Sequence, residues 1–326
     1  MMNKHVSKVI RILASGVFSM TAMAASYAET FPAHPMNMIV PYAAGGSSDF
    51  VARLLADKLG EQFGQPVVVE NRGGAGATIG TRLAAQKGQG GYTVLLADNA
   101  QTTAPALYRN LPYDSVRDFS VLGFVGKAQV MLFANKKSGI NSIQQLLTRA
   151  KNEPGGITIG TGYGSPSHLI TEFFNSKADI KLTVVPYKGS SVALSDLLGG
   201  HINLVFSNPA SAAALLKGDQ IVTLAQTGEQ RDPRFADVPT FKESGIKDFN
   251  ANYWFALLIP VDTPASIQMK WRTALQAALS DTEVQAKFDA AGLSPYDLSP
   301  DHAQQVMLDE VKQWEQVVKD AGINTN

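Results

Sequence analysis

The chain has 326 residues, with 28 basic and 28 acidic side chains and no cysteine. This length is sufficient for two domains of ordinary size, each with its own core. The lack of cysteine excludes disulfides, thiolate metal ligands and lipid attachment at an N-terminal cysteine, and the balanced charge gives no basis for nucleic-acid binding.

A secretory signal peptide is predicted at the N-terminus. Lys4, Lys8 and Arg11 precede an apolar run at 12–25, which is followed by small residues that suit a peptidase. The run is too short and too interrupted by polar residues to remain as a membrane span, which is the alternative interpretation. We expect cleavage after Ala28, export to the periplasm, and a mature chain with a net charge of about −3.

The first part of the mature chain alternates between strand and helix patterns. Apolar runs typical of buried strands lie at 38–40, 66–71 and 92–97. Helical spacing of apolar residues follows the first two of these strands, and a polar turn follows the third.

The same rhythm restarts after an apolar strand pair at 122–134 and a helix for which Ser142 is the predicted N-cap. Further strands are predicted at 157–160, 182–187, 202–206 and 253–260, and a helix is predicted at 168–175. The remainder of the chain is predicted to be helical.

Strands that alternate with helices imply an α/β fold with a mainly parallel sheet and right-handed crossovers. We interpret the strand at 253–260 as the return of the chain into the first domain. The predicted architecture is therefore two α/β lobes, residues 29–125 with 253–326 and residues 126–252, joined by two chain crossings.

Two turns rich in glycine and serine, at 45–49 and 162–168, each open a predicted helix. The first turn of a helix offers unpaired N–H groups and a positive dipole end, which bind anions without a basic side chain. Ligands of open α/β sheets bind at the carboxyl ends of strands, so the two turns are expected to face each other across a cleft. The alternative is an ordinary helix cap, and for His168 and Tyr42 it is plain packing.

Two enzyme classes are weighed against this interpretation. The glycines at 74–80 miss the spacing of a dinucleotide fingerprint. Ser47, Ser165, Ser167 and His168 are available to a hydrolase, but the chain has no Gly-x-Ser-x-Gly elbow. Zinc and calcium motifs are also missing. We therefore expect no catalysis, no cofactor and no metal.

Several motifs in order resemble one family across the whole chain. They are Ile39-Val40-Pro41-Tyr42 through Arg53, Gly64 through Arg72, Gly91 through Leu96, Leu111 through Asp114, Asp118-Phe119, Val185 through Gly189, Asp237 through Thr240, and Trp254 before Pro260. This pattern is similar to that of the Bug-type receptors of tripartite tricarboxylate transporters.

The resemblance implies a two-lobed Venus-flytrap protein, expected to be a monomer. Such a receptor traps a small carboxylate, often through ordered waters and loop amides, and delivers it to integral membrane transporter subunits. A sensory receptor for the same ligand is an alternative that the sequence leaves open. The motifs and the resemblance together give these ligand-binding candidates: Tyr42, Gly46, Ser47, Ser48, Asp49, Asn99, Thr102, Ser165, Ser167, His168, Gly189, Ser207 and Asn208.

The chain departs from the family pattern at three places. Ala44 replaces a proline before the paired glycines, which is expected to loosen the loop or make room for an aromatic ligand against Tyr42. Ser207 replaces an aspartate, which disfavours a ligand with an ammonium group. A Pro-Asp-Gly turn is replaced by Gln89-Gly90-Gly91, a surface change without an expected consequence.

Overall fold

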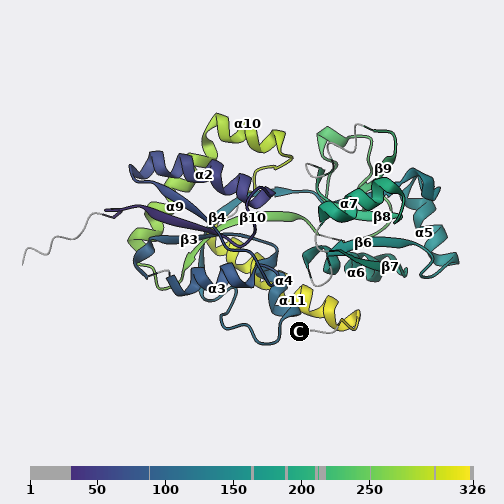
Figure 1. The fold of residues 1–326 in the computed structure, drawn as a ribbon, viewed down its shortest axis with the longest axis horizontal. Helices are drawn as coiled ribbons and strands as arrows, with labels where there is room; N and C mark the ends of the chain where they lie inside the picture. The colour runs from purple at the N-terminus through teal and green to yellow at the C-terminus, as the bar shows by residue number, and fades with distance from the viewer. Residues whose placement is uncertain are drawn as a thin grey trace, which may run out of the picture. The chain divides into compact units, whose positions relative to one another are not determined.

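The computed structural model describes residues 31–87, 89–162, 165–187, 190–209, 212, 218–249, 251–296 and 299–323. Within these residues the chain forms two five-stranded sheets, each flanked by helices on both faces (Figure 1). We call the elements around the first sheet the first lobe and those around the second sheet the second lobe. The predicted signal peptide lies outside the described residues.

The first sheet has the strand order β2-β1-β3-β10-β4. Its strands are β1 Met36–Val40, β2 Val67–Asn71, β3 Thr93–Asp98, β4 Phe119–Ala128 and β10 Tyr253–Pro260. Strands β2, β1 and β3 pair in parallel, whereas β10 runs antiparallel to both of its neighbours, β3 and β4. Strand β10, which we predicted as the return crossing, is thus the strand that runs opposite to all the others in this sheet.

The second sheet repeats this plan with the order β7-β6-β8-β5-β9. Its strands are β5 Met131–Asn135, β6 Thr158–Gly162, β7 Thr183–Tyr187, β8 Leu204–Ser207 and β9 Ile221–Gln226. Here β5 is the reversed strand, antiparallel to β8 and β9, while β6 pairs in parallel with β7 and β8. Both sheets are therefore mainly parallel in strand direction.

Helices cover both faces of each sheet because the strands are apolar on both sides. In the first lobe, α2 Ser47–Phe63, α9 Ala265–Ser280 and α10 Thr282–Ala290 lie on one face, and α3 Thr78–Lys87, α4 Ala100–Leu107 and α11 Pro300–Asp320 on the other (Figure 1). In the second lobe, α7 Ser190–Gly199 packs on one face, and α5 Ile143–Asn152 and α6 Pro166–Ala178 on the opposite face. Short 3-10 helices complete the list: η1 Gln89–Gly91, η2 Lys136–Ser138 and η3 Pro233–Phe235.

Helix α11 contributes to the cores of both lobes. Near its start, Ala303 and Met307 are buried with Phe124 and Trp254 of the first sheet. Near its end, Trp314, Val317 and Val318 join the core formed by β5, β6, α5 and α6. The ring of Trp314 lies 5.8 Å from that of Phe173, edge to face.

The local patterns placed several elements correctly and missed others. The N-cap prediction for α5 is confirmed, because the Ser142 hydroxyl accepts the Gln145 amide at 3.2 Å. Helix α4 was missed because all but one of its side chains are buried, so it lacks an amphipathic period, and it contains Pro105. Helix α7 and strand β9 were also not predicted.

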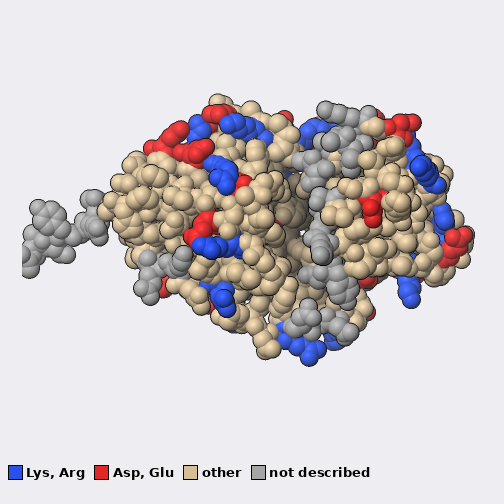
Figure 2. Space-filling model, in the orientation of Figure 1, with Lys and Arg blue, Asp and Glu red and all other residues tan. Residues whose placement is uncertain are grey.

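Charged side chains of both signs are interspersed on the face shown in Figure 2. Ion pairs join opposite charges at several places among the described residues, such as Lys58 with Glu283 and Arg231 with Glu243. A surface of this kind offers no extended field of one sign to steer a polyanion.

Candidate functional site

The loop between β1 and α2 presents backbone amides at the helix N-terminus. Gly45 has φ +89°, a conformation that favours glycine, and Gly46 is the N-cap without a side-chain cap bond. The first helical hydrogen bond is donated by the Phe50 amide to the Gly46 carbonyl at 3.0 Å. The amides of residues 47–49 precede this bond, so the helix provides them with no acceptor.

Asp49 holds this loop in place. Its carboxylate accepts the Gly45 amide at 2.9 Å and the Arg53 Nε at 3.0 Å. The hydrogen bond from Arg53 lowers the pKa of Asp49, and the guanidinium compensates its charge. The side chain of the predicted candidate Asp49 therefore supports the loop. Because Arg53 compensates its negative charge, Asp49 does not repel a carboxylate ligand that approaches the loop.

Tyr42 belongs to a buried cluster at the end of β3. Its hydroxyl donates to Asp98 Oδ1 at 2.8 Å, and the Tyr253 hydroxyl donates to Oδ2 at 2.6 Å. The Ala100 amide donates to Oδ1 at 2.9 Å. Burial raises the pKa of Asp98, which is only 2% exposed, although these three bonds favour its ionised form. Burial also raises the pKa of both tyrosines well above 10.0.

Asn99 and Thr102 lie close to this cluster, but their side chains are engaged within the protein. The Asn99 amide group donates to the Asn252 carbonyl at 3.0 Å and accepts the Trp254 amide at 2.9 Å. The Thr102 hydroxyl donates to Glu310 Oε2 at 2.8 Å. The structure therefore gives both candidates a role in fixing the start of β10, and their contact with a ligand stays a prediction.

Glu310 connects α11 to the same region. Its carboxylate accepts Trp254 Nε1 at 3.0 Å in addition to the Thr102 hydroxyl. Burial raises the pKa of Glu310 to about 7, more than these hydrogen bonds lower it. No local pattern in the sequence points to Glu310, because its partners lie far away along the chain.

The Glu310→Gln variant is expected to change the pH dependence of stability. The folded-state pKa, about 7, is above the ordinary 4.5, so this group stabilises the fold below pH 4.5 and loses that contribution as the pH rises through 7. Urea unfolding at pH 4.5 to 8 should show wild type losing up to about 3 kcal/mol relative to the variant across that range. Glu315→Gln, an exposed position on the same helix, is the control. Parallel pH profiles for wild type and Glu310→Gln would contradict the prediction.

The second glycine and serine turn lies between β6 and α6, and its hydroxyls bond to each other. Ser167 Oγ lies 2.8 Å from Thr161 Oγ1 and 2.9 Å from Ser165 Oγ, and it accepts the Gly162 amide at 3.2 Å. Residues 163–164 of this turn lie outside the described residues.

The N-terminus of α6 offers fewer amides than that of α2. Pro166 at the first helical position has no N–H, and the His168 amide donates to the Ser165 carbonyl at 3.0 Å. Of the first three residues of this helix, Ser167 is thus the one that has an N–H group without a backbone acceptor of this kind. The two turns, treated as equivalent in the sequence, differ in their capacity to bind an anion.

The remaining second-lobe candidates fall into different environments. His168 is 3% exposed, and burial lowers its pKa; Glu172 lies 3.8 Å away. Ser207 is buried at the end of β8, opposite Met131. Asn208 follows it and lines a cavity at the first glycine loop. Gly189 lies outside the described residues.

A cavity of about 290 Å³ lies against the first glycine loop. Its lining includes Gly45, Gly46 and Ser47 from the loop, Tyr253 from β10, and Asn208 from the second lobe. Apolar side chains from α2, the ends of β4 and β10, and the segment after α10 form the rest of its wall. Of the thirteen candidates, Gly46, Ser47 and Asn208 line this cavity, and Phe50, Tyr253 and Leu293 are lining residues that the sequence reasoning missed.

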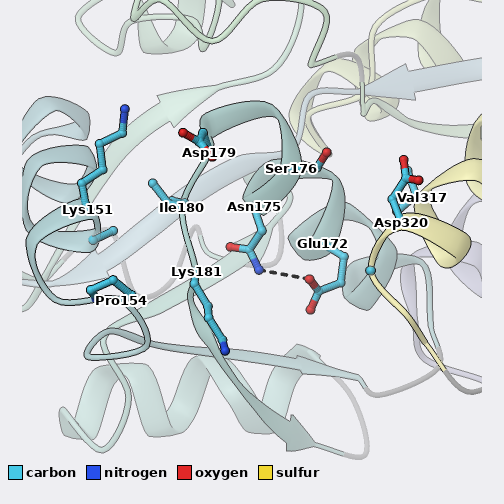
Figure 3. A pocket seen from close by; sticks show the side chains of 12 residues that line it. Lys151, Pro154, Glu172, Asn175, Ser176, Asp179, Ile180, Lys181, Val317 and Asp320 are labelled. Atoms are coloured by element: carbon cyan, nitrogen blue, oxygen red, sulfur yellow. Dashed lines mark hydrogen bonds between the residues drawn. The ribbon is translucent and has the colours of Figure 1, made fainter.

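A larger hollow of about 750 Å³ lies between α5, α6 and the end of α11 (Figure 3). Lys151 and Lys181 extend in different directions there, and Asn175 donates to Glu172 at 3.1 Å. Its charged groups do not converge on one point, whereas the smaller cavity has a helix N-terminus at one end. We therefore take the smaller cavity as the candidate site.

Among the residues that the structure describes, no helix combines the length and the apolar character needed to cross a membrane. No group of three or more histidine, aspartate or glutamate side chains is arranged to hold a metal ion in this part of the chain.

Two mixed sheets, with a cavity at a helix N-terminus and lining residues from both lobes, define a solute-binding protein of the two-lobed type. A family model described as tripartite tricarboxylate transporter family receptor matches residues 51–323. The chain belongs to this family of non-enzymatic binding receptors, so the hydrolase and nicotinamide-enzyme alternatives are not supported.

Solved structures agree with this assignment. The periplasmic binding protein BugD is 33% identical to this chain, with a TM-score of 0.78 over 91% of this chain and 100% of BugD. A Rhodopseudomonas palustris protein solved with adipate is 30% identical, with a TM-score of 0.79 over 91% and 100%. MatC from the same species, with bound malate, is 27% identical, with a TM-score of 0.77 over 88% and 100%. The predicted two-lobed α/β fold is thereby confirmed.

Proposed function

We propose that this protein is a periplasmic receptor that binds a small carboxylate and delivers it to a tripartite tricarboxylate-type membrane transporter. The ligand is a small mono-, di- or tricarboxylate, with an aliphatic or an aromatic body. The observation that carries the proposal is the cavity at the N-terminus of α2, where amides without helical acceptors meet a ligand-sized space. The dicarboxylates adipate and malate in two structural relatives support it.

The proposed mechanism is closure of the two lobes around the ligand, by a monomer. We keep the predicted boundaries, 29–125 with 253–326 and 126–252, as part of this proposal. Asn208 from the second lobe already lies at the same cavity as the first glycine loop. A ligand that contacts both lobes binds the closed state more tightly than the open one and shifts the population towards it.

The proposed cellular location of this protein and its proposed membrane partner are both inferred from its family. Its structural relative BugD is a periplasmic binding protein, and the predicted signal peptide would export this chain to the same compartment. A sensory role for the same ligand is the second candidate, because the binding fold is shared. Co-purification with the transporter's membrane subunits would favour delivery.

The test is a thermal-shift screen of the purified protein against carboxylates, amino acids and sugars. We expect stabilisation confined to a few carboxylates, because a ligand at 100 times its dissociation constant contributes about 2.7 kcal/mol to folding. Stabilisation by a sugar or an amino acid, with no carboxylate effective, would overturn the carboxylate assignment.

A further inference from the structure

The cavity at the first glycine loop is lined by that loop and by mostly apolar side chains. Beyond the loop amides, Tyr253 and Asn208, its lining consists of Phe50, Val51, Ala128, Phe255, Ala291 and Leu293. No charged side chain is among the described residues that line it. The wall therefore comes from four separate segments of the chain that only the folded structure brings together.

Phe50 is the lining residue whose environment most clearly suggests contact with a ligand. It lies one turn after Gly46 on α2, and the residue is 43% exposed. Because Phe50 lines the cavity and is still partly exposed, a ligand with an apolar body would bury more of its ring, which is favourable. Leu293 and Phe255, which line the same cavity, are already buried in the protein.

The composition of the wall limits the kind of molecule that fits. A carboxylate at the loop amides would place the rest of the ligand against the apolar side chains. Away from the loop, Tyr253 and Asn208 are the polar side chains among the described lining residues. Hydroxyl groups or further carboxylates that lie against the apolar side chains would therefore lose water without gaining a charged partner from the described lining. The volume of about 290 Å³ is at the small end for ligand sites, which are about 300 to 1,000 Å³.

We propose that the site selects carboxylates with a compact apolar body, a short alkyl chain or one aromatic ring, over hydroxylated and tricarboxylic acids. This inference rests on the proposed function and narrows its ligand class. Phe50 acts as a specificity-determining residue that packs against the apolar body, while the loop amides hold the carboxylate.

Calorimetric titration with acetate, butanoate, hexanoate, benzoate and citrate tests the inference. Affinity is expected to increase about fourfold for each methylene buried, until the chain fills the cavity, and benzoate should bind more tightly than citrate. Equal affinities along the series, or citrate as the tightest ligand, would overturn the inference. In both cases the binding of some carboxylate leaves the proposed function intact, whereas no binding of any carboxylate would remove the function as well.

The Phe50→Ala variant gives a second, independent readout. It is expected to weaken hexanoate or benzoate about fivefold and acetate less, because acetate has a single methyl group to bury against the ring. Met269→Ala, at an exposed apolar residue of α9 outside the lining, is the matched control. An equal loss for acetate and hexanoate would show that Phe50 affects the loop instead of the apolar body.

Discussion

Replacing Gly46 with valine is expected to weaken carboxylate binding at least tenfold while the protein stays folded. The backbone at Gly46 has φ −86°, which valine adopts without strain, and an added Cβ would have its nearest neighbour, the Ala43 carbonyl oxygen, at 4.0 Å. The two further methyl groups would occupy the cavity and cover the loop amides. Loss of one charge-assisted hydrogen bond, about 1.5 to 3 kcal/mol, already exceeds the tenfold limit.

Titration calorimetry of Gly46→Val with the best carboxylate from the screen provides the measurement. Gly60→Ala is the control, since it lies on the same helix, outside the cavity lining, and its Cβ would meet ordinary contacts at 3.5 Å or more. Gly46→Ser adds a contrast, because a serine N-cap would accept one of the helix's own amides and compete with the ligand without destabilising α2. Native affinity in a folded Gly46→Val protein would exclude the loop from the site.

Replacing Asp98 with alanine is expected to destabilise the protein by about 4 kcal/mol. The Asp98 carboxylate accepts hydrogen bonds from the hydroxyls of Tyr42 and Tyr253 and from the Ala100 amide. Alanine would leave these three donors without this acceptor in a buried environment, which costs about 1 to 3 kcal/mol for each group that stays unsatisfied.

Urea unfolding of Asp98→Ala measures this loss. Tyr253→Phe is the matched control, because it removes one donor and leaves Asp98 with two, for an expected cost of about 1 kcal/mol. Asp98→Asn should fall between these variants, since its amide oxygen still accepts. A loss for Asp98→Ala no larger than that for Tyr253→Phe would show that water replaces the missing acceptor.

The local sequence was sufficient to predict the structure of the glycine loop, but not the contacts of the residues around it. The small residues at 45–48 follow an apolar strand and precede helical spacing, so the strand, the turn and the helix could be predicted from neighbouring residues alone. In contrast, Asn99 and Thr102 have the residue types of a binding loop, yet their partners are Asn252, Trp254 and Glu310. Periodicity carries no information about contacts across such a separation.

The apolar wall of the cavity was beyond sequence reasoning for the same reason. Phe50 reads as one more apolar position of α2, and Leu293 as part of a C-terminal helical region. Their shared role emerges only when α2 and the segment after α10 meet at one cavity. Pro166, however, was a signal that could have been used, because a proline always removes one donor from a helix N-terminus.

We expect α11 to couple the unfolding of the two lobes. Met307 is part of one core and Trp314 of the other, so unfolding of the second lobe would remove packing partners from a helix that also supports the first. The chain should therefore behave as a single cooperative folding unit, despite its two separate sheets. A ligand bound at the glycine loop consequently protects the far end of the second lobe from unfolding as well.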